Sequence, residues 1–587
     1  MKFSSCGPAV LWTVSLSVIL ISSLRAAGST GKNYDGPAEL PREYVKSVLK
    51  DTPAGGKTWM VRAGESVKKV LETASCGDTI QLQAGATFPG NFVVPAKSCD
   101  DSHWIIIRTS APDSSLPPEG TRMTPCYAGV ASLEGRPPLH CASAANVLAK
   151  IEFDGMGGSG PIIFSSGANH YRLIGLEVTR TASGAAAYNL IEILGPADHL
   201  VFDRLWVHGT AQNDTVRGIL LGPSRYVAVV DSFFTDFHCE ANSAPCVDTQ
   251  AIIGGLGDGP MGPYKIVNNF LEASGENIMF GGGRATQTPQ DIEVRHNHMF
   301  KPPIWMKGQS GYVGGINGNP FIVKNLFELK NAQRVLLEGN IMENTWGGFT
   351  QVGFAIVLTP KNPGGCTNCQ VTDVTIRNNF ISHVGGGLQI ANALSDNGTA
   401  RDGQRYSIHD IVIDDIDGAK YDGPSLFAQI SVSVGAPLLQ NVVIDHVTAF
   451  PSRMLFMIGD MVATTTPMKS FAFTNSIVTA GTAPVWSTGG GPGNCAFHND
   501  PLTTFNTCFT SYTFAANAII AAPGTANWPK NNFFPGSAAA VRFANFNGGR
   551  GGDYHLQRSS PYTGKGQDGK DLGADVDAIH SATAGAE

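Results

Sequence analysis

The sequence predicts an all-β fold, a right-handed single-stranded parallel β-helix of about ten or more coils with loop insertions. Three observations predict it. Short strands recur along the chain with one position in register, glycine is abundant and charge sparse, and a helix followed by a strand precedes the repeats. Repeats of this kind bury a core only when neighbouring coils stack, so the chain should form a solenoid.

The first residues have the layout of a cleavable secretory signal. Lys2 is followed by an apolar run over 9–24 and then by small residues up to Gly28. We therefore expect a signal peptide over 1–28 and a secreted protein, periplasmic or extracellular. No later stretch has the roughly 18 to 20 apolar residues that a spanning helix needs, so no membrane span is expected.

The N-terminal region, 29–145, should hold a capping helix and the first strands. Val67, Val70, Leu71 and Ala74 follow helical spacing, and residues 76–85 then alternate as a strand does. A solenoid exposes apolar surface and strand edges at its end unless something covers them. The helix is therefore predicted to cap the first coil.

The β-helix core is expected over 146–485, because ten segments there share one pattern of two short apolar stretches separated by polar residues. They are 171–179, 199–207, 226–234, 264–272, 291–300, 334–343, 373–382, 410–417, 441–449 and 470–479. The excess length between segments should form surface loops. The remainder, 486–587, should contain the final coils and a tail.

One position falls in register just before the second apolar stretch of each segment. Its occupants are Gly175, Arg204, Ser232, Asn269, Asn297, Asn340, Asn379, Asp415, His446 and Ser476. Asparagine tolerates the left-handed backbone of a tight turn and can hydrogen-bond its counterpart one coil away. The four consecutive asparagines therefore predict a ladder across stacked coils.

The cysteines predict disulfides and an oxidising compartment. Of the 11 cysteines, only Cys6 would leave with the signal. The remaining ones fall in local couples: Cys76 with Cys99, Cys126 with Cys141, Cys239 with Cys246, Cys366 with Cys369, and Cys495 with Cys508. The CxxC spacing at Cys366 could also suit zinc, but a zinc ribbon needs a second such couple nearby.

The charge argues against nucleic acid as a partner. The net charge of -7 becomes about -9 once Lys2 and Arg25 leave, and an acidic surface repels phosphates. The sequence carries no oligomer signal, so a monomer is expected.

The chain resembles the pectate-lyase-like superfamily of parallel β-helix proteins. The resemblance rests on the segments GDTIQLQAG, HYRLIGLEV and DGKDLGAD and on the asparagine-bearing coils, and covers most of the mature chain. It implies the fold and a polysaccharide partner, while the same coils carry lyases, glycoside hydrolases, esterases and noncatalytic surface proteins.

Loop insertions concentrate between residues 276 and 372, so the substrate groove is predicted there. β-Elimination in a uronic-acid polymer needs a base, a cation beside the carboxylate and a proton donor. Lys330 is the favoured base, with Glu328 two residues away on the same strand face and Lys324 and Arg284 in support. This pairing is similar to that of alginate-lyase and chondroitinase-B-like enzymes, which implies calcium held by carboxylates.

Other residues of this stretch are candidates for binding substrate. Trp305 and Trp346 could stack on sugar rings or be buried under loops, and Lys301, Glu276 and His298 could line the groove. His296 and His298 share a strand face and could hold a metal, but no third ligand can be placed.

Two alternatives to a lyase stay open. A glycoside hydrolase would use two carboxylates, on the same or neighbouring coils. The candidates are Glu276, Asp291, Glu293, Glu338, Glu343, Asp414, Asp415 and Asp417. A noncatalytic glycan-binding or structural β-helix would lack a cluster of perturbed titratable groups.

Overall fold

The computed structural model describes residues 33–587 except 156–157, 183–184, 242–247, 349–350, 362–365, 395–400, 434, 460–466, 490 and 498–499. The predicted signal peptide, 1–28, lies outside the described residues. Asn33–Glu587 forms one unit. No helix in the described part of the chain is long and apolar enough to cross a membrane.

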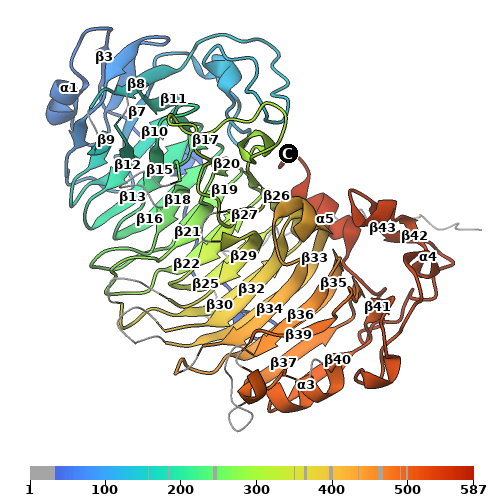
Figure 1. Ribbon diagram of the computed structural model, residues 1–587. Coiled ribbons are helices and arrows are strands. Elements are labelled where there is room, and N and C mark those ends of the chain that lie inside the picture. Colours follow the sequence, from blue (N-terminus) through green and yellow to red (C-terminus); the bar gives the residue numbers. More distant parts are fainter. Residues whose placement is uncertain are drawn as a thin grey trace, which may run out of the picture. The chain divides into compact units, whose positions relative to one another are not determined.

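The unit is a right-handed parallel β-helix, as the repeats predicted (Figure 1). Within the described residues, the coils build a twelve-stranded sheet and a 25-stranded sheet, each strand pairing in parallel with its counterparts one coil away. The 25-stranded sheet has two rows because a typical coil contributes two successive strands to it, such as β10 and β11, which are separated by a turn.

The strands of the twelve-stranded sheet come in chain order, one from each coil. They are β6 (Phe92–Val94), β9 (Gly158–Phe164), β12 (Ala187–Ile193), β15 (Thr215–Leu220), β18 (Gln250–Gly254), β21 (Glu276–Phe280), β24 (Phe327–Leu329), β29 (Phe354–Leu358), β32 (Gly386–Asn392), β34 (Leu426–Val432), β36 (Met454–Gly459) and β39 (Val485–Ser487).

The first row of the 25-stranded sheet contains β3 (Thr58–Val61), β4 (Thr79–Leu82), β7 (Ile105–Thr109), β10 (Asn169–Ile174), β13 (Ala197–Asp203), β16 (Ser224–Val230), β19 (Tyr264–Val267), β22 (Gln290–Arg295), β25 (Ala332–Glu338), β30 (Val371–Arg377), β33 (Gly403–Ile416), β35 (Gln440–Pro451), β37 (Lys469–Thr474) and β40 (Tyr512–Ala515). The long strands β33 and β35 continue into the second row. Its other members are β5 (Thr87–Pro89), β8 (Ala149–Phe153), β11 (Leu176–Arg180), β14 (Trp206–His208), β17 (Phe233–Phe237), β20 (Phe270–Ala273), β23 (His298–Phe300), β26 (Ile341–Thr345), β31 (Phe380–Val384), β38 (Ile477–Thr479) and β41 (Ala518–Ile520).

Helices and short strands lie outside the coils. The helices are α1 (Val67–Thr73), α2 (Gly418–Tyr421), α3 (Pro501–Cys508), α4 (Ala538–Val541) and α5 (Val576–Thr583). The antiparallel pairs are β1 (Tyr34–Asp35) with β2 (Ala38–Glu39), β27 (Gly347–Gly348) with β28 (Gln351–Val352), and β42 (Phe543–Asn545) with β43 (Asp553–Leu556). Helix α1 begins at the N-cap Ser66, whose hydroxyl accepts from Lys69 N, and it buries Val67 and Leu71 in the core as predicted.

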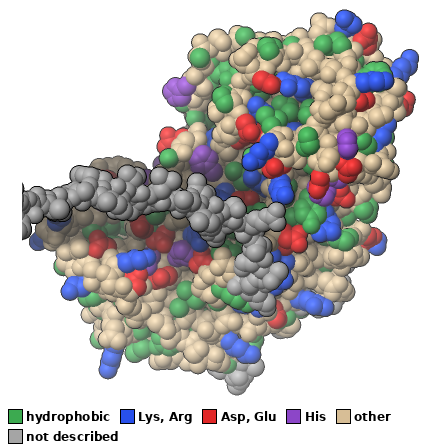
Figure 2. Space-filling model, turned by 180° about the vertical axis from the view of Figure 1, so that it is seen from behind, with side chains coloured by type: hydrophobic (Ala, Val, Ile, Leu, Met, Phe, Trp, Pro, Cys, Tyr) green, Lys and Arg blue, Asp and Glu red, His purple; other side chains and the backbone are tan. Residues whose placement is uncertain are grey.

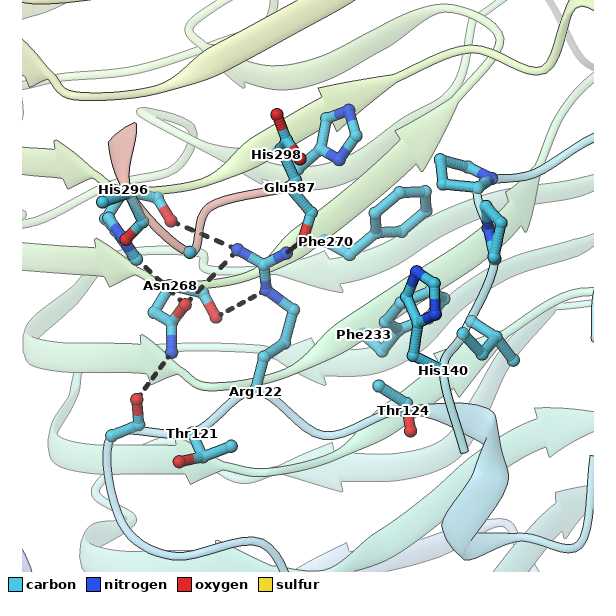
Figure 3. Close-up of a pocket in the computed structure, with 16 residues that line it drawn as sticks. Thr121, Arg122, Thr124, His140, Phe233, Asn268, Phe270, His296, His298 and Glu587 are labelled. Atoms are coloured by element: carbon cyan, nitrogen blue, oxygen red, sulfur yellow. Dashed lines mark hydrogen bonds between the residues drawn. The ribbon is translucent and has the colours of Figure 1, made fainter. Parts of the chain in front are cut away.

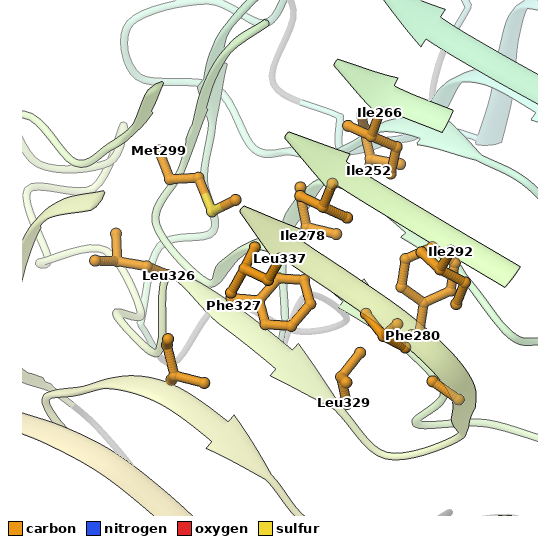
Figure 4. Close-up of a cluster of buried hydrophobic side chains, with 14 of the residues drawn as sticks. Ile252, Ile266, Ile278, Phe280, Ile292, Met299, Leu326, Phe327, Leu329 and Leu337 are labelled. Atoms are coloured by element: carbon orange, nitrogen blue, oxygen red, sulfur yellow. The ribbon is translucent and has the colours of Figure 1, made fainter. Parts of the chain in front are cut away.

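The core fills the space between the two sheets (Figure 4). Ile278 on β21 and Phe327 on β24 are paired in register and fully buried, and Ile266 and Ile292 face them from the 25-stranded sheet. Removing each such side chain from water contributes about 1.5–3 kcal/mol. This continuous core holds the strands at fixed spacing and makes their outer faces rigid platforms.

The asparagine ladder lies between the two rows of the 25-stranded sheet. Asn269 Nδ2 donates to Asn297 Oδ1 at 3.0 Å, Asn297 to Asn340 at 3.0 Å and Asn340 to Asn379 at 2.9 Å, all buried. The left-handed backbone belongs to the preceding residue instead, as at Asn268 with φ of 59°. The ladder asparagines therefore act by hydrogen bonding and not by tolerating the turn.

The strand register corrects part of the predicted alignment. Strand pairing places Leu176, Leu205, Ile411 and Val447 at the ladder position of their coils, where the sequence placed Gly175, Arg204, Asp415 and His446. The reason is that Gly175, Arg204 and His446 adopt the positive φ of the turn, one residue earlier. In β33 the residue with the positive φ of this turn is Asp410, so Ile411 takes the ladder position and Asp415 falls four residues after it.

Four of the predicted disulfides are present, Cys76–Cys99, Cys126–Cys141, Cys366–Cys369 and Cys495–Cys508. Cys239 is also disulfide-bonded, and Cys246, its predicted partner, lies outside the described residues.

Figure 2 shows the face opposite to the view of Figure 1, where acidic and basic side chains are interspersed.

Candidate active site

A row of hydrogen-bonded polar side chains crosses four coils on the outer face of the twelve-stranded sheet. Arg217 on β15 pairs with Asn189 on β12 and with Gln250 on β18. Its Nε donates to Gln250 Oε1 at 3.0 Å, and Gln250 Nε2 donates to Glu276 Oε2 at 2.8 Å. Neighbouring coils are about 4.8 Å apart, so the row presents evenly spaced polar groups along the solenoid axis.

The row ends in a cluster of three carboxyl groups and two lysines. Lys324 Nζ lies 3.1 Å from Asp248 Oδ2 and 3.7 Å from Glu276 Oε1. Lys330 Nζ lies 3.1 Å from Glu328 Oε1. These five residues, which we call the carboxyl–lysine cluster, come from β21, from β24 and the segments on both sides of it, and from the segment before β18.

The cluster is mostly shielded from water, and its acids and bases are exposed to different degrees. The side chain of Glu276 is 0% exposed and that of Glu328 5%, whereas Lys330 is 18% and Asp248 21% exposed. Asn325 Nδ2 also donates to Glu328 Oε2 at 2.8 Å. An approaching molecule would therefore meet Lys330, Lys324 and Asp248 first, with the two glutamates beneath them.

Burial and mutual repulsion separate the pKa values of the carboxyl groups. Burial raises the pKa of Glu328 to about 7. The Lys330 charge lowers this pKa, and the Glu276 charge raises it further. Burial would also raise the pKa of Glu276, but the Lys324 charge outweighs it and holds that pKa well below its usual range. Burial and the Glu276 charge raise the pKa of Asp248.

The same contacts keep both lysines protonated. Burial would lower the pKa of Lys330, but the Glu328 and Glu276 carboxylates outweigh it and raise that pKa. Lys324 behaves in the same way, with Glu276 and Asp248 as its partners. At neutral pH the cluster thus combines an ionised Glu276, a Glu328 that both gains and loses a proton near pH 7, and two ammonium groups.

Lys301, a predicted substrate contact, lies behind this sheet and not on its face. It is fully buried, and its ammonium donates to Ala273 O and to Asn277 Oδ1 at 3.1 Å. Burial lowers the pKa of Lys301 to about 7. Its donors all bond to atoms at or just before the start of β21, so it braces the strand that carries Glu276.

Arg284, Trp305 and Trp346 lie apart from the cluster's ion pairs. Arg284 is 71% exposed and forms an ion pair with Asp258 at 3.0 Å. Trp305 is 1% exposed and packs edge-on against Phe321, so its ring offers no face to a sugar. Trp346 is 6% exposed in the same apolar cluster and lines a cavity of about 270 Å³.

His298 lies on the second row of the 25-stranded sheet, where it lines a cavity of about 440 Å³ (Figure 3). Its Nε2 bonds to Glu343 Oε2 at 2.8 Å, and its ring contacts Phe270. His296 Nε2 bonds to the Ala584 carbonyl oxygen at 2.8 Å. The two histidines thus have separate partners in this cavity.

The other carboxylates considered for hydrolysis lie on the 25-stranded sheet, except Asp417, which is the N-cap residue of α2. Asp291 pairs with Arg334 at 2.7 Å, and Glu338 with Arg377 at 2.7 Å. Asp415 bonds to His383 at 2.8 Å. Of that set only Glu276 lies on the twelve-stranded sheet, where it meets Asp248 and Glu328.

Sequence reasoning missed Asp248, Arg217 and Gln250. Asp248 and Gln250 lie just before or at the start of a strand whose next residues are apolar, as in Gln250-Ala-Ile-Ile, and Arg217 lies inside β15 before Gly218, Ile219 and Leu220. This signal becomes visible only after the strands are aligned coil by coil. The alternation of Lys324, Glu328 and Lys330 was visible because it is local.

No family model matches the chain, and no curated protein matches it. Among solved structures, the catalytic domain of a GH87 α-1,3-glucanase in complex with tetrasaccharides matches with a TM-score of 0.47 and 10% identity, over 81% of this chain and 70% of that one. The pectate lyase Pel9A matches with a TM-score of 0.38 and 11% identity, over 89% of this chain and 97% of that one. The PL6 family alginate lyase AlyGC matches with a TM-score of 0.38 and 11% identity, over 88% of this chain and 58% of that one. At these identities the similarity concerns the fold alone.

Proposed function

We propose that the chain is a secreted polysaccharide lyase that cleaves a uronate-containing polymer by β-elimination at the carboxyl–lysine cluster. The observation that carries this proposal is the contact between Glu328, whose pKa is about 7, and the Lys330 ammonium. Few surface carboxyl groups titrate near neutral pH, and such groups concentrate at catalytic sites. The polar row beside the cluster gives an extended chain a track to lie along.

The chemistry assigns one role to each group. The lysine ammonium groups neutralise the uronate carboxylate, which makes the adjacent C5 proton more acidic. The ionised Glu328 takes that proton, the C5–H electron pair forms the C4–C5 double bond, and the C4–O4 bond breaks. The leaving O4 takes a proton from the Lys330 ammonium, which restores the charge balance.

These roles differ from those expected from sequence, where Lys330 was the base. A lysine whose pKa is raised by two carboxylates stays protonated at neutral pH and cannot accept a proton. Glu328 is the group in the cluster that exchanges a proton there. Lys330, Glu328 and Lys324 stay in the proposed catalytic set with Glu328 in place of Lys330 as the base, whereas Arg284, which was also predicted, lies outside the cluster.

The calcium ion predicted from the sequence has no role in the reaction steps proposed above. A calcium ion needs several oxygen ligands around one point. Lys324 and Lys330 already lie against the carboxylate oxygens of the cluster. In the described part of the chain these three carboxyl groups also do not form a group with all ligand atoms within 4.8 Å of one another.

Glycoside hydrolysis is the second candidate, and the separation of two carboxyl pKa values favours it. Glu276 stays ionised while its neighbour Glu328 holds a proton up to about pH 7. An acid paired with a carboxylate is the chemical requirement for hydrolysis. A hydrolase would produce saturated sugar ends.

The test is to incubate the mature protein with uronate-containing and neutral polysaccharides, with and without calcium, while following ultraviolet absorbance and reducing ends. A rise in both ultraviolet absorbance and reducing ends would establish a lyase. A rise in reducing ends without a rise in absorbance would establish a hydrolase. Glu328→Gln and Lys330→Ala should each lower kcat at least a hundredfold. Lys469→Ala, which removes an exposed lysine on β37, should leave it unchanged. Full activity of both cluster variants, or no product from any polymer, would overturn the proposal.

A further inference from the structure

Three aromatic side chains from consecutive coils stack on the first row of the 25-stranded sheet, far from the carboxyl–lysine cluster in sequence. The rings of His170 and His199 lie 4.5 Å apart and 4° from parallel, and Tyr226 stacks on His199 at 4.7 Å. Trp104 contacts His170 edge-on at 5.0 Å. Asp101, next to this stack, completes a group with the two histidines whose ligand atoms all lie within 4.8 Å of one another.

The outer nitrogen of each histidine has a defined partner. His170 Nδ1 lies 2.9 Å from Asn169 Oδ1, and His199 Nδ1 lies 2.8 Å from Asp198 Oδ1. The orientation of the Asn169 amide is fixed, because its Nδ2 donates to the Lys97 and Gly167 carbonyl oxygens. Both Nδ1 atoms therefore face oxygens that only accept, so both carry a proton.

This protonation leaves the inner nitrogens as bare acceptors when the rings are neutral. His170 Nε2 lies 3.2 Å from Asp101 Oδ1, and His199 Nε2 lies 3.9 Å from the same oxygen. Two lone pairs and a carboxylate then converge with no donor between them, an arrangement that a cation stabilises.

We propose that Asp101, His170 and His199 form a binding site for a divalent transition-metal ion of the zinc class. Two imidazole nitrogens and one carboxylate oxygen are ligands that such ions prefer. Bonds of about 2.1 Å in tetrahedral geometry hold ligand atoms about 3.4 Å apart, close to the 3.2 and 3.9 Å found. The oxygens on both Nδ1 atoms are the second shell that fixes ring orientation in metal sites.

The proposed metal site is open to solvent on one side, so a fourth ligand can reach it. Asp101 is 84% exposed and can move by the small amount that coordination needs. Asp101 and His199 line a cavity of about 370 Å³, which Lys46, Asp51 and Tyr226 also line. A fourth ligand, water or an oxygen of a bound molecule, can enter from this cavity, which is the pattern of a site with an open position.

The test is a calorimetric titration of zinc chloride into the mature, tag-free protein after dialysis against EDTA, at pH 7.5 in a non-coordinating buffer. We expect one equivalent of Zn²⁺ to bind with micromolar or tighter affinity and to raise the unfolding temperature. His199→Ala and Asp101→Ala, which change partly or fully exposed side chains, should weaken binding at least tenfold. Asp198→Ala, which removes the oxygen at His199 Nδ1, should weaken it ten- to a hundredfold.

The matched control is His103→Ala, an exposed histidine two residues from Asp101 that pairs with Asp100 at 2.8 Å outside the group. It should bind Zn²⁺ like the wild type. No saturable binding to the wild type would overturn the proposal and assign the stack a purely structural role. Binding that survives His199→Ala and Asp101→Ala unchanged would place the metal elsewhere and overturn it equally.

Discussion

Glu328 is the side chain through which pH acts on the carboxyl–lysine cluster. Its folded pKa of about 7 lies above its ordinary value of 4.5, so the folded protein holds a proton over an interval in which the unfolded chain has lost it. Stability from this group is therefore full at low pH and is lost as pH rises towards 7. Glu328→Gln cannot lose a proton, so the variant should gain stability relative to the wild type between pH 5 and pH 8.

Urea unfolding of both proteins at the two pH values measures this difference. The relative gain should be of order 1–3 kcal/mol, because one pKa unit corresponds to about 1.4 kcal/mol and the neighbouring charges offset part of it. The control is Asp258→Asn, which changes an exposed carboxylate beside Arg284 and should show no such gain. An equal stability difference at pH 5 and pH 8 for Glu328→Gln would show that Glu328 titrates normally.

Local spacing brings together three of the five residues of the carboxyl–lysine cluster. Lys324, Glu328 and Lys330 lie within one short segment, and strand alternation places the last two on one face. Asp248 and Glu276 reach the same point from earlier coils, across loops whose length follows no period. The pKa values that assign roles depend on these contacts, so the exchange of roles at Lys330 could not be predicted from the sequence.

At the scale of elements, the asparagine ladder ties neighbouring coils together. Asn297 accepts from Asn269 N at 2.9 Å and donates through Nδ2 to Ile266 O at 2.9 Å and to Asn340 Oδ1 at 3.0 Å. Asn297→Ala removes these bonds and leaves their buried partners unsatisfied, which costs about 1–3 kcal/mol for each group. We expect the variant to lose about 2–4 kcal/mol of unfolding free energy, measured by urea denaturation.

Asn527→Ala is the matched control, since Asn527 is exposed outside the coils. Its effect should stay within about 0.5 kcal/mol. A loss at Asn297 no larger than that at Asn527 would mean that backbone pairing alone holds the turns together.

The strands themselves were predictable because each coil must bury the same kind of apolar strand and therefore repeats the same sequence pattern. All ten strand segments expected from sequence coincide with paired strands, as at 264–272 with β19 and β20. The exact register was not, because a turn needs one residue with positive φ and glycine, arginine and histidine all supply it. Polar residues such as Arg204 therefore resemble ladder members in the sequence, although they form the turn before the ladder position.

At the scale of the whole unit, the N-terminal segment 33–52 runs along the outside of the 25-stranded sheet and spans many coils. Arg377 Nη1 lies 2.8 Å from Asp35 Oδ2 at one end of this segment, and the Arg172 guanidinium donates to Ser47 O at 2.8 Å at the other. Glu39 N donates to Asp373 Oδ1 between them. The segment thus links coils that are hundreds of residues apart in sequence.

His409 makes this link sensitive to pH. Burial would lower the pKa of His409, but hydrogen bonds to Asp35 and Asp410 outweigh it and raise the pKa to about 9. A histidine whose folded pKa exceeds its ordinary 6.5 contributes stability that is full below pH 6.5 and is lost as pH rises through 9. The wild-type unfolding temperature should therefore fall between pH 6.5 and about pH 9.5.

Asp35→Asn removes one of the two carboxylates that hold the His409 charge, so its unfolding temperature should fall less over the same interval. Amide hydrogen exchange should also show weaker protection of β33 and of β1 in the variant, because the end of the N-terminal segment is released. Asp100→Asn breaks an exposed pair with His103 and should match the wild type at every pH, since exposed pairs contribute little. Parallel curves for wild type and Asp35→Asn would show that the segment is held by its backbone and apolar contacts, and that the ion pairs at His409 do not fasten it.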